Sequence, residues 1–327
     1  MDLRYFFSFA AGICFSNDGS CATMWGMKCQ LCPINCNVDR SITKGACKCG
    51  QLPVVARVSR HMWEEPCISG TNGSGTVFFS GCNLNCRFCQ NREISRTGKG
   101  VPLTVSQLAD VFLSVSESGV HNINLVTPQQ FSDVIAQSLE KVKHKLRVPV
   151  VYNTNSYEKV EALQRLCGLV DVYLPDLKFF SAELARNYCG RSDYFDVATR
   201  AITEMRRQQP VNRYDEQGII ARGVVLRHLV LPSSVEDSKL VLDWIAQFDK
   251  SMPVSLMAQY FPPHHDDKYP QLNRRLTVRE YNNIREYFTN VGLTEGYEQD
   301  PRSATADYVP DFDVENIQQL YENLKKL

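Results

Sequence analysis

The chain has 327 residues, of which 43% are hydrophobic and 22% are charged, a composition typical of a globular protein with one large domain and an appendage. Lys plus Arg and Asp plus Glu both number 36, so there is no global field to draw the chain to nucleic acid or to an anionic membrane. No stretch after the first residues is apolar for long enough to span a bilayer, and we expect no membrane partner.

Residues 1–20 are expected to form an N-terminal extension. Its first twelve residues are a poor signal peptide, because their charges are mixed and no A-x-A cleavage site follows. The chain has 13 cysteines, and most fall in short-spaced groups suited to chelation rather than to the disulfides of a small secreted protein. We therefore expect a reducing compartment and a cytoplasmic location.

Residues 21–60 form a cysteine-rich leader with too few apolar residues to build a core of its own. Small segments of this kind are usually held together by metal. Zinc and a second iron–sulfur cluster fit thiolate ligands equally well, and reduced cysteines without metal are the remaining alternative. Cys49 is a substitute for the last of the four expected ligands, which are Cys29, Cys32, Cys36 and Cys47.

Residues 61–265 are expected to form the main domain, and from residue 76 onward short β-type runs alternate with amphipathic helical patterns. Strands are predicted at 76–80, 122–127, 148–152, 170–174, 224–231 and 254–260, and helices at 104–117, 131–145, 156–167, 194–207 and 237–248. This alternation predicts an α/β fold, with a parallel sheet and crossover helices outside it. A C-terminal extension, residues 266–327, follows with helices at 277–289 and 313–326.

Three thiols, Cys82, Cys86 and Cys89, stand in a C-x3-C-x2-C array directly after the apolar run 77–79. A [4Fe-4S] cube normally takes four cysteines, so three would leave one iron open to a non-protein ligand. The alternatives are a zinc knuckle that lacks one ligand and ordinary buried cysteines.

This array, with Phe88 as the aromatic residue before its last cysteine, resembles the signature of the radical S-adenosylmethionine (SAM) superfamily. The resemblance implies a partial (β/α)6 TIM-type barrel in which SAM chelates the open iron. It also implies reductive cleavage of SAM to methionine and a 5′-deoxyadenosyl radical, with Cys82, Cys86 and Cys89 as the catalytic cluster ligands. The cysteine-rich leader resembles a branch of proteins similar to pyruvate formate-lyase activating enzyme.

The resemblance also implies SAM contacts at the carboxyl ends of the strands, where chemistry gathers in such barrels. Two positions depart from the family pattern, since only the Pro-containing turn at Thr127-Pro128 survives of a Gly-Gly-Glu-Pro stretch, and Asn153 stands where an acid is usual. For Asp176 and Lys178 the alternatives are a helix cap and a solvated charge, and for His228 the alternative is a structural role. The implied contacts are Phe88, Thr127, Pro128, Asn153, Thr154, Asp176, Lys178 and His228.

Other polar residues carry weaker signals. Arg227 and His228 are expected to face a polar barrel interior, because polar side chains in an apolar run need partners. Gln259 and Tyr260 are candidates for lining the substrate space, whereas residues 264–267 fit a solvated loop better than a metal site. Four cysteines outside any ligand spacing are expected to be ordinary thiols: Cys14, Cys21, Cys167 and Cys189.

The function implied by the resemblance is an activase that takes hydrogen from a glycine of a partner enzyme similar to a glycyl radical enzyme. A flavodoxin or ferredoxin would donate the electron. One alternative is radical SAM modification of another peptide, an RNA or a small molecule, and the neutral charge disfavours RNA. An alternative of another class is a non-catalytic protein that binds an iron–sulfur cluster or zinc.

Overall fold

The computed structural model describes residues 28–299, 312 and 316–327. The predicted extension 1–20, Cys14, Cys21 and the start of the last predicted helix lie outside these residues.

All six predicted strands are present, and their neighbours pair in parallel. They are β2 (Ser74–Phe79), β4 (Ile123–Val126), β5 (Val150–Thr154), β6 (Val172–Pro175), β9 (Leu226–Leu229) and β10 (Val254–Met257). β8 (Ile220–Val224) pairs with β6 and leads directly into β9, and a bridge between Asp176 and Arg227 joins β6 to β9. The α/β fold with a mostly parallel sheet is therefore confirmed.

Four further strands flank this array. They are β1 (Val54–His61), β3 (Val101–Pro102), β7 (Arg213–Tyr214) and β11 (Gly296–Glu298). β1 runs antiparallel to β2 along its whole length, so the last residues of the range predicted for the leader belong to the sheet. The signal for this strand was weak, because Val55 and Ala56 are both buried and break the alternation of inward and outward side chains.

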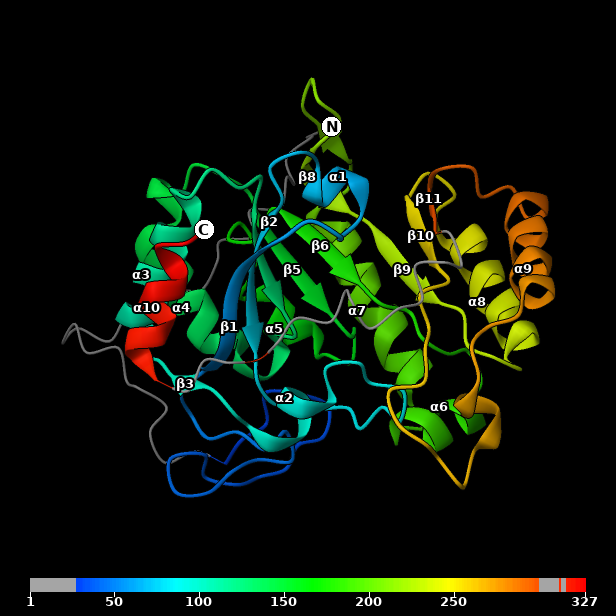
Figure 1. Ribbon diagram of the computed structural model, residues 1–327, viewed down its shortest axis with the longest axis horizontal. Helices are drawn as coiled ribbons and strands as arrows, with labels where there is room; N and C mark the ends of the chain where they lie inside the picture. The colour runs from blue at the N-terminus through cyan, green and yellow to red at the C-terminus, as the bar shows by residue number, and fades with distance from the viewer. Residues whose placement is uncertain (1–27, 300–311, 313–315) are drawn as a thin grey trace, which may run out of the picture.

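Helices cover the outer side of the sheet (Figure 1). Two predicted helices, those over 104–117 and 277–289, have Thr104 and Thr277 as N-cap residues in capping boxes, which satisfy free N–H groups of the first turn. The helix predicted over 156–167 is only five residues long, and the helix Ala182–Cys189 was not predicted. The α-helices are α1 (Pro66–Ser69), α2 (Arg92–Thr97), α3 (Val105–Ser116), α4 (Ser132–Val142), α5 (Val160–Gln164), α6 (Ala182–Cys189), α7 (Tyr194–Gln208), α8 (Val235–Phe248), α9 (Val278–Asn290) and α10 (Ile317–Leu324).

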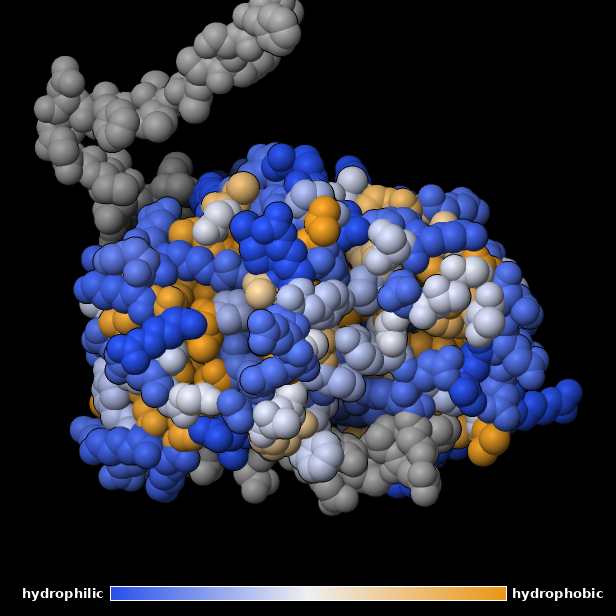
Figure 2. Space-filling view, turned by 90° about the horizontal axis from the view of Figure 1, so that it is seen from above, coloured by the Kyte–Doolittle hydropathy of each residue, from blue (hydrophilic) through white to orange (hydrophobic). Residues whose placement is uncertain are grey.

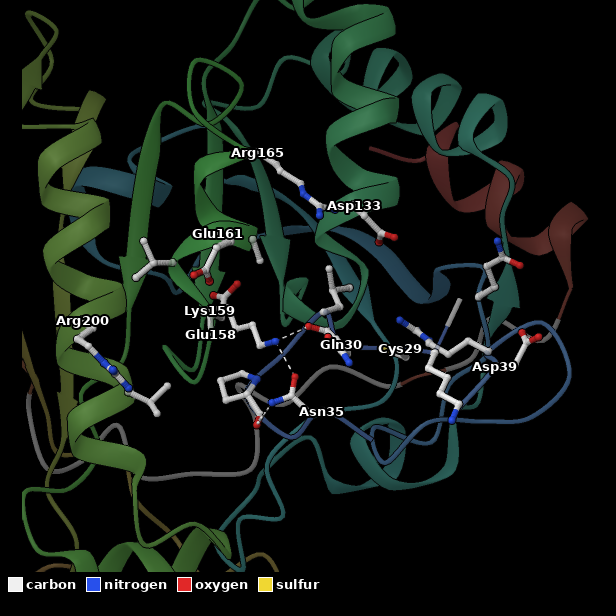
Figure 3. Close-up of a pocket in the computed structure, with 18 of the residues that line it drawn as sticks. Cys29, Gln30, Asn35, Asp39, Asp133, Glu158, Lys159, Glu161, Arg165 and Arg200 are labelled. Carbon is white, nitrogen blue, oxygen red and sulfur yellow. Dashed lines mark hydrogen bonds between the residues drawn. The ribbon is translucent and has the colours of Figure 1, made fainter. Parts of the chain in front are cut away.

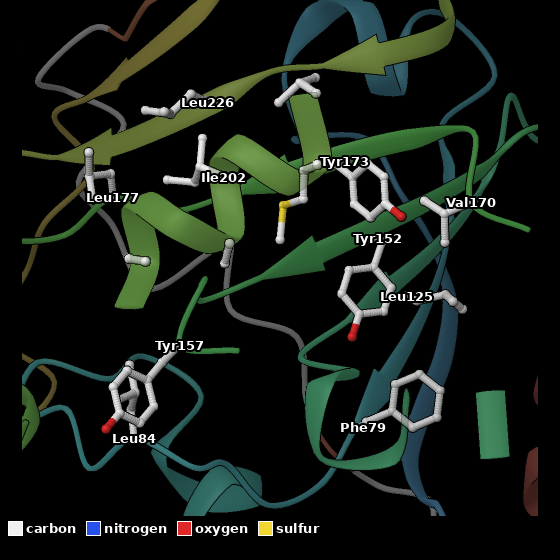
Figure 4. Close-up of a cluster of buried hydrophobic side chains, with 14 of the residues drawn as sticks. Phe79, Leu84, Leu125, Tyr152, Tyr157, Val170, Tyr173, Leu177, Ile202 and Leu226 are labelled. Atoms are coloured by element: carbon white, nitrogen blue, oxygen red, sulfur yellow. The ribbon is translucent and has the colours of Figure 1, made fainter. Parts of the chain in front are cut away.

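The core lies between the sheet and this helical layer (Figure 4). Leu125, Tyr152 and Tyr173 stand in register on adjacent strands, and the two tyrosine rings meet edge to face at 6.0 Å. Their hydroxyls are not orphaned, because Tyr152 donates to Glu158 at 2.9 Å and Tyr173 donates to Gln208 at 2.6 Å. The core is therefore apolar with satisfied polar ends.

The surface seen from above is mainly hydrophilic, with hydrophobic residues scattered through it (Figure 2). Within the described residues, no helix is both long and apolar enough to cross a membrane.

Candidate functional site

The three motif thiols open onto one cavity. Cys82, Cys86 and Cys89 lie on the loop that leaves β2, and they line a space of about 240 Å³ together with the carboxyl ends of β4, β5, β6 and β9. The position follows from the topology, because parallel strands end at the same edge of a sheet. A larger cavity of about 870 Å³ lies beside the leader and contains none of these three thiols.

The sulfur of Cys82 is surrounded by donors. The Asn155 amide reaches it at 3.3 Å, the backbone N–H of Leu84 at 3.4 Å and the Gln129 amide at 3.8 Å. A neutral thiol is a weak acceptor, whereas a thiolate bound to iron carries charge and accepts such bonds readily. The donor set therefore fits an iron–sulfur ligand.

The other thiols also suit this role. The described cysteines form no disulfide with one another. Burial raises the pKa of Cys82 to about 11 and raises the pKa of Cys86 well above its ordinary range. Buried thiols of this kind become thiolates when a metal replaces their protons. Cys82, Cys86 and Cys89 are thus the residues that would hold a [4Fe-4S] cluster.

A buried ion network forms one wall of the cavity. Arg227 donates to Asp176 at 2.9 Å, to Asn153 at 2.6 Å and to Glu64 at 3.2 Å. Lys178 adds a second cation on Asp176, at 2.5 Å. The charged side chains are only 11–14% exposed, so each depends on its partners rather than on water.

The network shifts the pKa values of its acids in opposite directions. Burial alone would raise the pKa of Asp176, but the cations Arg227 and Lys178 outweigh it and lower that pKa. Burial raises the pKa of Glu64, and it raises the pKa of the adjacent Glu65 to about 7, although Arg227 opposes both shifts. The wall therefore combines a fixed carboxylate with an acid that titrates near neutrality.

Most of the SAM contacts implied by the sequence lie together on this cavity. Pro128 and His228 do not line it. Both ring nitrogens of His228 are used elsewhere, at 2.7 Å from the Leu177 carbonyl and 2.9 Å from the Ser238 hydroxyl, and burial lowers its pKa to about 4. The implied contacts that line the cavity are Phe88, Thr127, Asn153, Thr154, Asp176 and Lys178.

Of the two substrate-space candidates, Gln259 lines the cavity, whereas Tyr260 is buried and donates to the Leu272 carbonyl at 2.6 Å. In the Pro-flanked loop, Asp266 is buried and accepts from Arg87 at 2.9 Å, which differs from the expected solvated loop. His265 and Asp267 are exposed as expected.

Sequence reasoning missed the segment 61–65. His61, Trp63, Glu64 and Glu65 come before the motif in the chain, yet they line the same cavity as its thiols. The signal that was available is the pair of adjacent acids ahead of a buried strand, since buried acids need cations. Arg227 is the cation that meets them.

The leader packs against the motif loop and against the outside of the barrel. Lys159 at the start of α5 donates to the Gln30 carbonyl at 2.7 Å and to the Asn35 side chain at 2.6 Å (Figure 3). On the other side, the N–H of Cys82 donates to the Cys47 carbonyl at 3.2 Å. The leader thus contacts the first motif cysteine directly.

Comparison with known proteins agrees with this geometry. Residues 76–232 match the family model of the radical SAM superfamily. The chain is also 30% identical over 264 residues to an uncharacterized protein of Methanocaldococcus jannaschii, a match that covers 77% of this chain and 71% of the relative. The chain belongs to the radical SAM superfamily. Membership implies a [4Fe-4S] cluster and SAM as cofactors, and reductive cleavage of SAM as the chemistry.

Three solved structures resemble the radical SAM chain only in overall fold. SuiB of Streptococcus suis is 15% identical with a TM-score of 0.46, covering 68% of this chain and 47% of SuiB. Methylornithine synthase (PylB) is 16% identical with a TM-score of 0.43, covering 77% of this chain and 81% of PylB. The hydrogenase maturase HydG of Carboxydothermus hydrogenoformans is 14% identical with a TM-score of 0.44, covering 77% of this chain and 65% of HydG. The chain spans about half the length of SuiB, and the family assignment does not depend on these scores.

Proposed function

We propose that this chain is a radical SAM enzyme that removes a hydrogen atom from a glycine of a partner protein, in the manner of an activating enzyme. The observation that carries the proposal is the cavity in which three free thiols face the ion network at the strand ends. When bound there, the cluster supplies the electron that cleaves SAM to methionine and a 5′-deoxyadenosyl radical.

The protein's own residues bind and orient the reactants. Cys82, Cys86 and Cys89 would hold the cluster, and three thiolate ligands would leave one iron open to SAM. Lys178 faces the cavity and offers a cation to the SAM carboxylate, and Asp176 keeps that cation charged, since its carboxylate raises the pKa of Lys178 against the effect of burial.

The rim of the cavity supports a protein substrate. Trp63 lines the cavity and is 63% exposed, and its neighbour Met62 is 40% exposed. Large exposed apolar side chains beside a site are typical anchors for a bound polypeptide segment. A small substrate enclosed by the cavity would not require them.

The test is transfer of deuterium. Anaerobically reconstituted protein is given dithionite, SAM and a candidate partner protein that is deuterated at glycine. Deuterium in 5′-deoxyadenosine, together with a glycyl radical signal in the partner, is the expected result. Formation of 5′-deoxyadenosine without deuterium would move the substrate to another peptide, an RNA or a small molecule. No 5′-deoxyadenosine at full cluster content would reject the radical reaction and leave a metal-binding protein.

A rim variant separates binding of the partner from the cleavage of SAM. Trp63→Ala should raise the concentration of partner needed for half-maximal transfer by about tenfold, as loss of an interface anchor does. SAM cleavage without a partner should be unchanged. Val278→Ala is the matched control, because Val278 is 65% exposed on the distant α9.

A further inference from the structure

The leader contains a second set of thiols. Cys29, Cys32 and Cys36 are half-buried and Cys47 is buried, and none of them is in a disulfide with a described residue. Cys32 lies close enough to the other three to interact with each of them electrostatically. A Cβ atom placed on Gly45 would lie 3.5 Å from the sulfur of Cys36 and 3.4 Å from the sulfur of Cys47, so both sulfurs are close to Gly45.

The part of the leader that carries these thiols, residues 28–53, has no helix and no strand. Two sharp turns are made by Asn35 and Asn37, whose φ angles are 47° and 53°. Short backbone hydrogen bonds close them, with Cys29 donating to Val38 at 2.8 Å and accepting from Asn37 at 3.0 Å. A segment with so little regular structure needs a cross-link to stay ordered, and a metal centre supplies one.

A half-buried cation lies beside the same thiols, and its guanidinium packs on the Phe131 ring. Arg40 lies close enough to Cys29 and Cys47 to interact with both. One of its N–H groups donates to the Gln130 carbonyl at 2.7 Å, but its Nε and Nη2 atoms are buried without a hydrogen-bond partner among the described residues. Buried N–H groups without partners are rare, and the sulfide and thiolate sulfurs of an iron–sulfur cluster accept such bonds.

The spacing of the thiols favours a cluster over a single ion. Across residues 28–299, 312 and 316–327, no three Cys, His, Asp or Glu side chains lie close enough to share one ion. Zinc would require its sulfurs at about 2.3 Å from one point. The motif thiols Cys82, Cys86 and Cys89 are also too far apart to share one ion, although their array matches the superfamily signature of a [4Fe-4S] cluster. In a cube, each thiolate binds a different iron.

Cys49 is distinguished from Cys47 by its contacts. Its thiol donates to the Ser80 carbonyl at 3.2 Å and is 1% exposed, so it packs behind the motif loop as a thiol. The Cys47 side chain is hydrogen-bonded to that of Cys49. Of the two, it is Cys47 that interacts with Cys32 and whose sulfur approaches Gly45 together with the Cys36 sulfur. Cys47 is therefore the fourth ligand.

From this arrangement we infer that Cys29, Cys32, Cys36 and Cys47 bind a second iron–sulfur cluster. One of these four residues, Cys47, is hydrogen-bonded through its backbone to Cys82 of the motif loop. The inference does not depend on the reaction proposed above.

The test counts metal rather than activity. Anaerobically reconstituted wild type should hold about eight irons and about eight sulfides per chain, and Cys29→Ala/Cys32→Ala should hold about four of each. Cys82→Ala/Cys86→Ala should also hold about four, with an electron paramagnetic resonance spectrum that does not change on addition of SAM. Cys167→Ala is the control, because Cys167 is exposed, and it should hold about eight.

Several outcomes would overturn the inference. One is about four irons in wild type, with or without one zinc that is lost from Cys29→Ala/Cys32→Ala. Another is a Cys82→Ala/Cys86→Ala protein that retains no iron. That second arm still decides the question if the leader variant does not fold. Failure of the proposed reaction would leave the iron count of wild type unchanged, so the two failures are distinguishable.

Discussion

Replacing Arg227 with methionine tests whether the ion network holds the strand ends together. Methionine keeps the length of the side chain but removes the ion pairs to Glu64 at 3.2 Å and to Asp176 at 2.9 Å. Asp176 keeps Lys178, whereas the structure provides no second cation at hydrogen-bonding distance from Glu64 among the described residues. The larger loss should therefore fall on Glu64.

The magnitude follows from burial. The paired side chains are 11–14% exposed, and breaking a buried ion pair on one side costs about 3–5 kcal/mol. At about 2 °C per kcal/mol for a chain of this size, the midpoint of thermal unfolding should fall by about 6–10 °C. Arg285→Met is the matched control, since its pair with Glu298 is 48% and 35% exposed and is worth about 0–1 kcal/mol.

The effect should also depend on pH. Burial raises the pKa of Glu65 from its ordinary value of 4.5 to about 7 and also raises that of Glu64, and Arg227 restrains both shifts. Without Arg227 both pKa values rise further in the folded state, so the folded protein binds protons that the unfolded chain releases. Stability then falls as pH rises. The loss should be smaller at pH near 5 than at pH near 8.

The assay is thermal unfolding followed by circular dichroism under anaerobic conditions, at matched iron content and at both pH values. An equal loss at the two pH values would show that Glu64 and Glu65 do not sense Arg227. A loss no larger than that of Arg285→Met would show that the network adds nothing to stability. Either result would refute the reasoning.

Three other substitutions test separate parts of the structure. Glu158→Gln removes a buried acid whose pKa is raised by burial from 4.5 to about 7; wild type should lose about 2–3 kcal/mol of stability relative to this variant between pH 5 and pH 8, because only the folded state holds the proton. Gly81→Ala places a Cβ 2.4 Å from the Cys47 carbonyl oxygen at a φ of 77°, and it should lower the iron content and expose the leader to protease. The control is Gly168→Ala, which has a φ of 79° and no atom within 4 Å of the new Cβ, and it should cost only about 1–2 kcal/mol of stability. Asn155→Ala removes a donor to a motif sulfur and should shift the potential of the cluster to more negative values in a redox titration followed by paramagnetic resonance.

The parts of the fold that sequence predicted are those with local signals. The six strands and the flanking helices follow from periodicity over ten or so residues, and the three motif thiols follow from spacing within eight residues. Thr127 and Lys178 both line the cavity, as expected for residues at or just after the ends of predicted strands, because parallel strands end at one edge.

The missed parts depend on contacts between distant segments. Glu64 and Arg227 are 163 positions apart, and no local pattern links them. His228 was chosen as the cofactor contact, but adjacent residues of a strand point to opposite faces. Because Arg227 faces the cavity, His228 faces α8, where its ring is hydrogen-bonded to the Ser238 hydroxyl. The alternation within the strand could have indicated one residue or the other, and the acids at 64 and 65 decide which.

Both segments that precede the motif in sequence contact its site in space. The leader contacts Gly81 and Cys82, and the segment 61–65, which begins beside the amino end of β2, lines the cavity that the thiols face. The shared superfamily domain covers residues 76–232 and so contains the three thiols but neither of these segments. Because Glu64, Trp63 and Cys47 all lie outside the shared domain and yet contact its site, the features that distinguish this enzyme from other superfamily members should be sought in residues 28–65.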